Sequence, residues 1–149
     1  MIYRRRPIVT ARAAQALMIR TLGSGSNGIG YYMYHGGSTP LRQDNIGSYQ
    51  DEPMGIPKIS YDFQAPLGEF GLEHPSYRYL RTIHSFLADF GSNLAPMETV
   101  LPEGWEKMTP ENRDDLRYAA RMKDDSGFIF MINFQDHDTL RHDMDGLQP

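Results

Sequence analysis

The chain has 149 residues and is 40% hydrophobic, which is typical of one globular domain and unlike a disordered or fibrous protein. It contains no cysteine, which excludes disulfides, thiol nucleophiles and thiolate metal sites and leaves the cellular compartment open. No apolar run reaches the roughly 18 residues of a membrane-spanning helix, so we expect no membrane partner.

The net charge of −4 is unevenly distributed, because residues 1–43 carry six arginines and no acidic residue. Such a basic, acid-poor segment is typical of a transit peptide, of a nucleic-acid contact, or of a helix with a basic solvent face. The segment leads into a helical pattern, so we expect the solvent face and no nucleic-acid partner.

The first predicted elements follow the order of an α/β protein. Residues 11–22 predict a helix, with Thr10 as its cap and Gly23 at its end. Residues 29–35 form an uncharged run, which is typical of a strand covered on both faces in a parallel sheet.

A long polar segment, residues 36–73, separates this run from a second predicted helix over residues 75–90. Connections of this length are usually functional or disordered, and the aromatic residues Tyr61, Phe63 and Phe70 argue against disorder. Gly91 is expected to end the second helix.

The remaining sequence changes character at residue 92. Residues 92–113 are rich in proline and glutamate and predict a linker, and residues 114–135 alternate in hydrophobicity around the turn residues KDDSG. We interpret residues 114–135 as a β-hairpin of a second, all-β domain and residues 136–149 as a polar tail that frays. The tail gathers histidines and aspartates in DHDTLRHDMDG, but their spacing fits no established metal site, and we expect no metal.

A strand buried on both faces needs neighbours at both edges, and the only other predicted strands lie in a different unit. The predicted fold is therefore incomplete. Either other chains complete it, or the sequence is a piece of a larger protein, and we expect the second.

Four segments resemble glycoside hydrolase family 35, the β-galactosidases. These are YMYHGGS (32–38), SYDFQAPLGEFG (60–71), YRYLRTIHSFL (77–87) and RYAARMKDDSGFIFMINFQ (117–135). The family's usual forms of the first two are YM, two variable residues and GGTN, and SYDYDAPLDEYG. The resemblance implies that residues 1–91 are the C-terminal portion of a catalytic (β/α)8 TIM barrel. Residues 11–22, 29–35 and 75–90 would be its seventh helix, eighth strand and eighth helix.

The candidate substrate-binding residues are Tyr32, Tyr61, Phe63 and His35. Tyr32 and Tyr61 match family positions that hydrogen-bond the galactosyl ring, and a phenol suits this work because it offers both an apolar ring and a hydroxyl. Phe63 stands where the family has a second tyrosine, and Gln64 replaces an aspartate. These differences concern sugar specificity more than fold.

Two interpretations of His35 stay open. A histidine at the end of a barrel strand can shuttle a proton or contact a sugar, or it can be a packed residue that donates a hydrogen bond to a loop carbonyl. We expect the packed residue.

A retaining glycosidase needs two carboxylic acids, and in this family both are glutamates from the fourth and seventh strands. Neither matches a position in this sequence. We therefore interpret Asp62 and Glu69 as residues that hold the loop by hydrogen bonds. The resemblance predicts a glycosidase fragment that binds carbohydrate, uses no cofactor and is inactive alone. The alternative is a non-catalytic carbohydrate-binding or assembly module completed by a partner chain.

Overall fold

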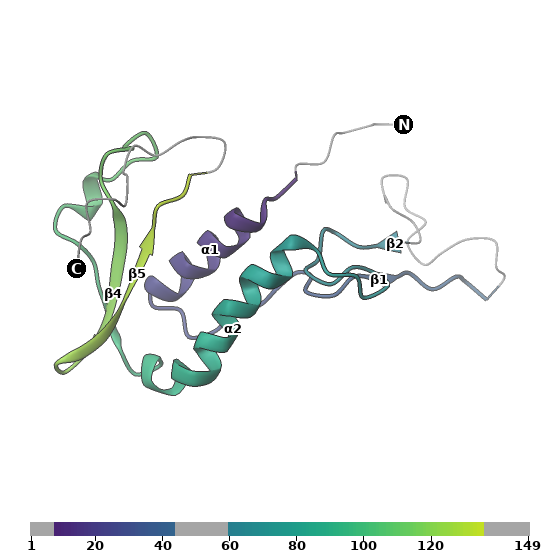
Figure 1. Cartoon of the computed structure of the whole chain (residues 1–149), viewed down its shortest axis with the longest axis horizontal. Helices are drawn as coiled ribbons and strands as arrows, with labels where there is room; N and C mark the ends of the chain where they lie inside the picture. Colours follow the sequence, from purple (N-terminus) through teal and green to yellow (C-terminus); the bar gives the residue numbers. More distant parts are fainter. Residues whose placement is uncertain (1–7, 44–59, 136–149) are drawn as a thin grey trace. The chain divides into compact units, whose positions relative to one another are not determined.

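The computed structural model describes residues 8–43 and 60–135 and contains two α-helices, a short 3-10 helix and two small antiparallel sheets (Figure 1). The described chain is therefore mixed α/β, as the sequence predicts. The elements are α1 (Ala11–Gly23), β1 (Gly37–Ser38), β2 (Ser60–Tyr61), α2 (Pro75–Leu94), β3 (Glu98–Val100), η1 (Trp105–Lys107), β4 (Arg117–Lys123) and β5 (Ser126–Ile132).

The described residues divide into two compact units. The first contains residues 8–11, 30–43 and 60–79, and the second contains residues 12–29 and 80–135. The sheet of β3, β4 and β5 thus shares a unit with most of α1 and of α2. The predicted boundaries at residues 91 and 113 do not coincide with this division and stay predictions.

The two predicted helices are present, and the second is longer than predicted. The first helix begins at Ala11 as expected, whereas α2 continues through Gly91 to Leu94. Burial explains the extension, because Leu94 is only 2% exposed. Burying a leucine gains about 1.5–3 kcal/mol, which exceeds the roughly 1 kcal/mol cost of a glycine inside a helix. The prediction that Gly91 ends the helix is wrong.

The predicted buried strand over residues 29–35 is also wrong. This segment forms no ladder, and its one strand-like contact is an isolated parallel bridge between His35 and Leu67. Tyr32, in the middle of the segment, is 80% exposed. A strand must pair its backbone groups with neighbouring strands, and the described part of the chain places none beside this segment.

The predicted hairpin is confirmed, with a third strand at its edge. The second sheet has the order β3-β4-β5 with both pairings antiparallel. A turn joins β4 to β5 at Asp124, whose φ of 52° lies in the left-handed region. Residues 92–113, predicted as a linker, contain the end of α2, all of β3 and η1, so much of that stretch is regular structure.

The inner face of this sheet packs aromatic residues against α2. Phe86 of α2 meets Phe128 and Phe130 of β5 edge to face, with ring centroids 5.3 and 6.1 Å apart. The register places Arg121 opposite Phe128 and Ala119 opposite Phe130, so these residues of β4 share the inner face.

Arg121 is the most buried polar residue described, with an exposed fraction of 1%. Its guanidinium donates to the carbonyl oxygens of Leu22 at 3.0 Å, of Leu94 at 3.1 Å and of Met97 at 2.9 Å, and to Oδ1 of Asn27 at 2.9 Å. Leu22 and Leu94 lie in the last turns of α1 and α2, where carbonyl groups have no partner within the helix. One side chain therefore caps both helices and ties them to the sheet.

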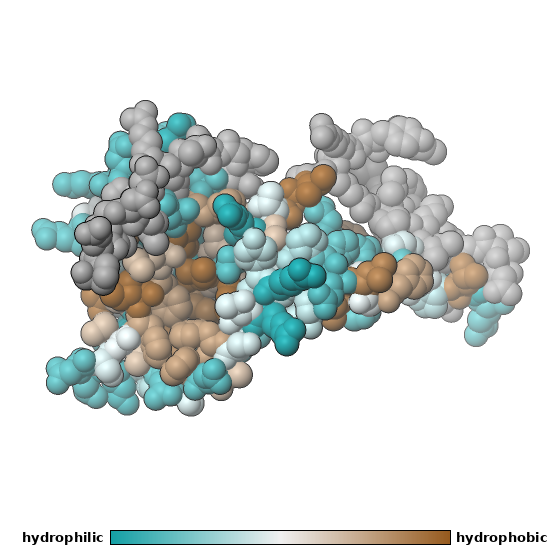
Figure 2. All heavy atoms as spheres, in the orientation of Figure 1, coloured by the Kyte–Doolittle hydropathy of each residue, from teal (hydrophilic) through white to brown (hydrophobic). Residues whose placement is uncertain are grey.

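Neither helix among the described residues is both long and apolar enough to cross a membrane. The hydrophobic residues instead gather where β4 and β5 meet α1, as the brown surface in Figure 2 shows.

We predict that Arg121→Met destabilises the chain by about 3–5 kcal/mol, because several buried carbonyl oxygens would lose their donor. Urea unfolding followed by Trp105 fluorescence measures this change. The matched control is Arg117→Met, which removes an arginine from the same strand face whose bonds to Asn112 and Gln135 lie nearer the surface. Equal losses of stability in the two variants would contradict the capping role of Arg121.

Candidate functional site

Three of the four predicted substrate-binding residues lie together in the first unit. The ring centroids of Tyr61 and Phe63 are 4.4 Å apart. The ring centroid of Tyr32 lies 6.5 Å from that of Tyr61 and 6.4 Å from that of Phe63. The Tyr32 and Tyr61 hydroxyls are hydrogen-bonded to each other. We call these three residues the aromatic cluster.

The pairing of β1 with β2 brings the cluster together. Gly37 pairs with Tyr61 and Ser38 with Ser60, so the segment that follows Tyr32 is joined to the segment that carries Tyr61. Phe63 and Gln64 then both have positive φ values, of 49° and 55°. This conformation costs roughly 1–2 kcal/mol for a residue other than glycine. Backbone strain of this kind is frequent at functional sites.

The aromatic cluster is accessible. Tyr32 is 80% exposed and Phe63 44% exposed, while Tyr61 is half-buried. The hydrogen bond with Tyr61 raises the pKa of Tyr32 above its ordinary value of 10.0, so the Tyr32 phenol is neutral near pH 7. When one hydroxyl donates to the other, the pair keeps one O–H donor and several acceptor lone pairs for a ligand.

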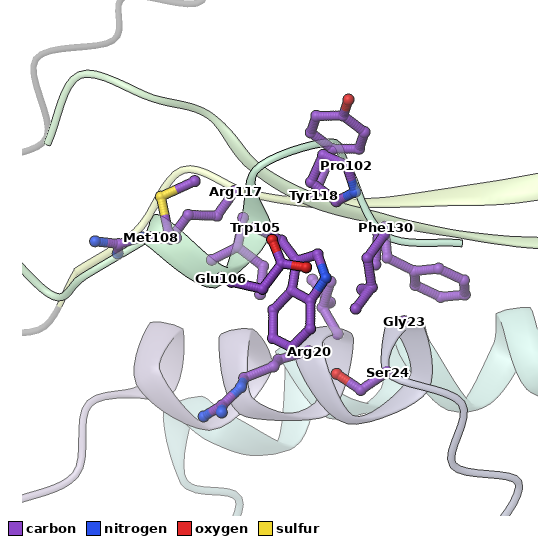
Figure 3. Close-up of a pocket in the computed structure, with 14 residues that line it drawn as sticks. Arg20, Gly23, Ser24, Pro102, Trp105, Glu106, Met108, Arg117, Tyr118 and Phe130 are labelled. Atoms are coloured by element: carbon purple, nitrogen blue, oxygen red, sulfur yellow. The ribbon is translucent and has the colours of Figure 1, made fainter. Parts of the chain in front are cut away.

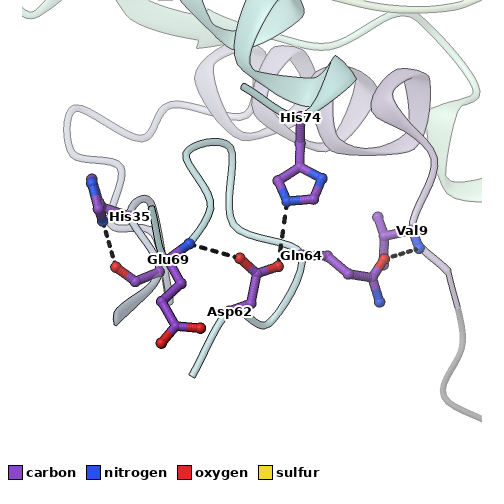
Figure 4. Close-up of polar contacts among 7 residues, drawn as sticks. Val9, His35, Asp62, Gln64, Glu69 and His74 are labelled. Atoms are coloured by element: carbon purple, nitrogen blue, oxygen red, sulfur yellow. Dashed lines mark hydrogen bonds and ion pairs between the residues drawn. The ribbon is translucent and has the colours of Figure 1, made fainter. Parts of the chain in front are cut away.

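His35 lies outside the aromatic cluster. Its Nδ1 faces the carbonyl oxygen of Gly36, as the dashed line in Figure 4 shows. A carbonyl oxygen only accepts, so Nδ1 carries the proton. Within the described residues His35 makes no hydrogen bond or ring contact with the cluster. The donation to a backbone carbonyl agrees with the second interpretation of His35, but the side chain is exposed and not packed.

Asp62 and Glu69 hold the loop that carries the cluster, as the sequence analysis proposes (Figure 4). Asp62 Oδ1 accepts from the backbone N–H of Glu69 at 2.9 Å, and Asp62 Oδ2 lies 3.3 Å from His74 Nε2. The carboxylate of Glu69 accepts a hydrogen bond from the hydroxyl of Ser38 on β1. Hydrogen bonds from Ser38 and Ser60 lower the pKa of Glu69 below its ordinary value of 4.5.

Gly36 allows the backbone segments of this unit to approach closely. Its N–H donates to the Leu67 carbonyl at 2.7 Å, and the Leu67 N–H donates to the Tyr34 carbonyl at 3.0 Å. A Cβ atom at Gly36 would lie 2.7 Å from the backbone nitrogen of Glu69 and 3.1 Å from the Cα of Asp62. Only glycine fits this position without moving backbone.

Sequence reasoning missed Ser38, Ser60 and His74 as partners of the two carboxylates. Ser38 stands at a threonine position of the family motif, and the hydroxyl that both residues carry could have indicated a hydrogen bond to a carboxylate. No sequence pattern predicts the contact of His74 with Asp62, because this contact depends on how the loop folds. Gln64 also gains a role, since its Oε1 accepts from the Val9 N–H at 3.1 Å.

A separate groove of about 410 Å³ lies in the second unit between α1, η1 and the sheet (Figure 3). Trp105, which is 50% exposed, and Glu106 line it from η1. Arg117 also lines it, but its guanidinium is engaged with the Asn112 carbonyl and Gln135. The rest of the lining is mostly apolar, so the groove offers surface for packing more than groups for a reaction.

Among the residues that the structure describes, no three histidine, aspartate or glutamate side chains are placed to hold a metal ion. The histidine- and aspartate-rich segment at residues 136–146 lies outside the described residues.

No family model matches the chain, and no solved structure matches it. The assignment to glycoside hydrolase family 35 therefore depends on the sequence motifs and stays a proposal.

We predict that acidification loosens the pairing of β1 with β2. Because the folded pKa of Glu69 is lowered, its stabilising contribution is present above pH 4.5 and is lost as the pH falls through the folded pKa. On acidification, the amides of residues 37 and 61 should lose protection from hydrogen exchange, once the measured rates are corrected for the intrinsic effect of pH. Glu69→Gln should abolish this loss, whereas Glu73→Gln, a change at an exposed carboxylate nearby, should not. An unchanged profile in Glu69→Gln would contradict the role of the carboxylate.

A second prediction compares two adjacent glycines. Gly36→Ala should destabilise the first unit by about 1–3 kcal/mol, because the new methyl group meets backbone atoms that must shift. Gly37→Ala should cost much less, since a Cβ there meets nothing within 4 Å. The exchange rate of the Leu67 amide measures both effects. Equal rates in the two variants would show that the close approach at Gly36 is unimportant.

Proposed function

We propose that the chain supplies the sugar-contacting aromatic wall of a retaining β-galactosidase-like glycoside hydrolase and does not catalyse hydrolysis alone. The observation that carries this proposal is the convergence of Tyr32, Tyr61 and Phe63 in one accessible cluster. Tyr32 belongs to the first resembling motif and the other two to the second. Their contact supports the view that the motifs serve one site.

The chemistry of the cluster suits a pyranose ring. A β-galactoside has an apolar face of C–H groups and a rim of hydroxyls that both donate and accept. The rings of Tyr61 and Phe63 offer apolar surface, and the bonded hydroxyls of Tyr32 and Tyr61 offer a donor and acceptors beside it. Rings alone would bind any flat apolar ligand, whereas the hydroxyl pair adds directional contacts.

The partial (β/α)8 barrel belongs to the same proposal. In it α1 and α2 are the seventh and eighth helices, and the aromatic cluster lies at the catalytic face, where βα loops build the sites of such barrels. The other strands of the barrel would come from outside this sequence.

The carboxylates of the loop are poorly suited to catalysis. A retaining glycosidase places two carboxyl groups about 5–5.5 Å apart and raises the pKa of the one that acts as acid. Glu69 has the opposite shift, and both oxygens of Asp62 face hydrogen-bond donors. In the proposal both catalytic glutamates therefore come from outside this sequence, and no cofactor takes part.

Because hydrogen bonds hold the carboxylates of Asp62 and Glu69, a second candidate function is also favoured. It is a carbohydrate-binding or assembly module without any catalytic partner. The two candidates differ in one property. A fragment of a hydrolase gains turnover when the remainder of the barrel is supplied, and a binding module does not.

We predict saturable binding of methyl β-galactoside to the chain at millimolar concentration, measured by titration calorimetry. Tyr32→Phe and Tyr61→Phe should each weaken binding about two- to tenfold, because each removes a hydroxyl worth about 0.5–1.5 kcal/mol as a hydrogen-bond partner. Tyr79→Phe, which alters an exposed tyrosine of α2, is the matched control. Absence of binding, or equal weakening by the control, would overturn the proposal.

Turnover separates binding from catalysis. The chain alone should release no chromophore from a chromogenic β-galactoside. Hydrolysis that disappears on Asp62→Asn or Glu69→Gln would show that the loop carboxylates are catalytic and would contradict the proposed division of roles.

A further inference from the structure

Among the residues that the structure describes, no strand pairs with the outer edge of β5. The register with β4 pairs Lys123 with Ser126 across a two-residue turn, which makes them a hydrogen-bonded pair, and such pairs recur at every second residue. Phe128, Phe130 and Ile132 therefore direct their N–H and C=O groups toward β4. The intervening residues Gly127, Ile129 and Met131 direct theirs outward, where the described part of the chain supplies no partner.

None of the usual protective features occurs along this edge. Natural edge strands are commonly short, charged, bulged or interrupted by proline. β5 has seven residues, SGFIFMI, with no charge and no proline, and its ladder with β4 is continuous. Ile129 is 65% exposed and Met131 45% exposed on the outer face. These are the properties of a strand that pairs with another strand.

An apolar groove lies beside this edge. It has a volume of about 370 Å³ and is bounded by β5 and by Ile19, Ile83 and Phe86 of the two helices, all within the second unit. A strand added to β5 would point alternate side chains toward the helices, as β5 itself does with Phe128 and Phe130. The groove provides space for those side chains, and Figure 2 shows hydrophobic surface in this region.

We propose that β5 pairs antiparallel with β5 of a second copy of this chain, with Ile129 on the two-fold axis. In this register Gly127 of one copy lies opposite Met131 of the other, so all three outward residues find partners and about six hydrogen bonds form. An antiparallel strand pair of this kind is self-complementary, as a two-fold interface requires.

Charge complementarity favours a second copy over an unrelated strand. The acidic turn Asp124-Asp125 precedes β5, and in this register it lies beside the residues that follow Ile132 in the other copy. Those residues, Asn133 and Phe134, line a groove with Arg12 of α1. At each end of the interface the register thus brings the two aspartates of one copy to residues that share a groove with Arg12 of the other.

The interface also closes at two copies. In the dimer the two β5 edges pair with each other and are no longer exposed. The opposite edge of each sheet is β3, which has three residues and carries Glu98. A short, charged edge resists further pairing. The inference does not depend on the proposed function, because it uses none of the residues of the aromatic cluster.

The proposal is tested by measuring the molar mass of the chain in solution by analytical ultracentrifugation over a wide micromolar range of protein concentration. We expect a dimer, and we expect Ile129→Lys to weaken dimerisation at least about 100-fold, since two ammonium groups would face each other across the axis. The matched control is Tyr118→Lys, which places the same charge on the outer face of the central strand, where exposure is 45%. This control should still dimerise.

A crosslink checks the register. The chain has no cysteine, so Ile129→Cys introduces a unique thiol, and a directly opposed hydrogen-bonded pair places the two Cα atoms about 5.5 Å apart, within disulfide reach. Mild oxidation should give a covalent dimer with Ile129→Cys and not with Tyr118→Cys.

Circular dichroism and urea unfolding confirm that each variant is folded before it is scored. A monomer at all concentrations overturns the proposal, as does a dimer that Ile129→Lys leaves intact. Equal disruption by Tyr118→Lys would indicate packing of the sheet faces instead, and growth beyond two copies would indicate open-ended edge pairing; both outcomes also overturn it.

Discussion

The packing of the second unit depends on one buried arginine. Removing a guanidinium from water is costly unless its N–H groups find acceptors, and Arg121 meets this condition with oxygens at the ends of two helices instead of with a carboxylate. Its positive charge also lies where the dipoles of α1 and α2 are negative. The bonds form only if both helices end at the sheet, so the arginine joins α1, α2 and β4, which lie far apart in the sequence.

The first unit is held together by different means. Of the buried hydrophobic residues described, Ala65 alone belongs to it, whereas Leu22, Leu80, Ile83 and Leu94 belong to the second unit. Hydrogen bonds to carboxylates and close backbone approach therefore replace an apolar core. Such a unit opens more easily than a packed one, and the lowered pKa of Glu69 makes the stability of the β1–β2 pairing dependent on pH. A binding loop is compatible with this low local stability.

Local periodicity predicted the helices and the hairpin, and it failed where distant contacts decide the structure. The alternation of Tyr118, Ala120 and Met122 favours burying those residues, yet Arg121 on the opposite face is the buried residue of β4, because helix-end carbonyls accept the guanidinium. The strand predicted over residues 29–35 depends on neighbours that no local pattern supplies. The meeting of Tyr32 with Tyr61 was suggested only by resemblance, since it requires the pairing of β1 and β2 across residues 44–59.

The two units present different polar groups for recognition, and this difference bears on what each can bind. In the first unit they are two phenol hydroxyls beside exposed rings, a small directional set that suits a ligand with its own hydroxyls. In the second they are backbone groups repeated along an uncharged strand, which only another extended backbone can satisfy. A sugar cannot pair with the strand edge, and a strand gains little from the hydroxyl pair. We therefore expect a substitution in one surface to leave recognition by the other unchanged.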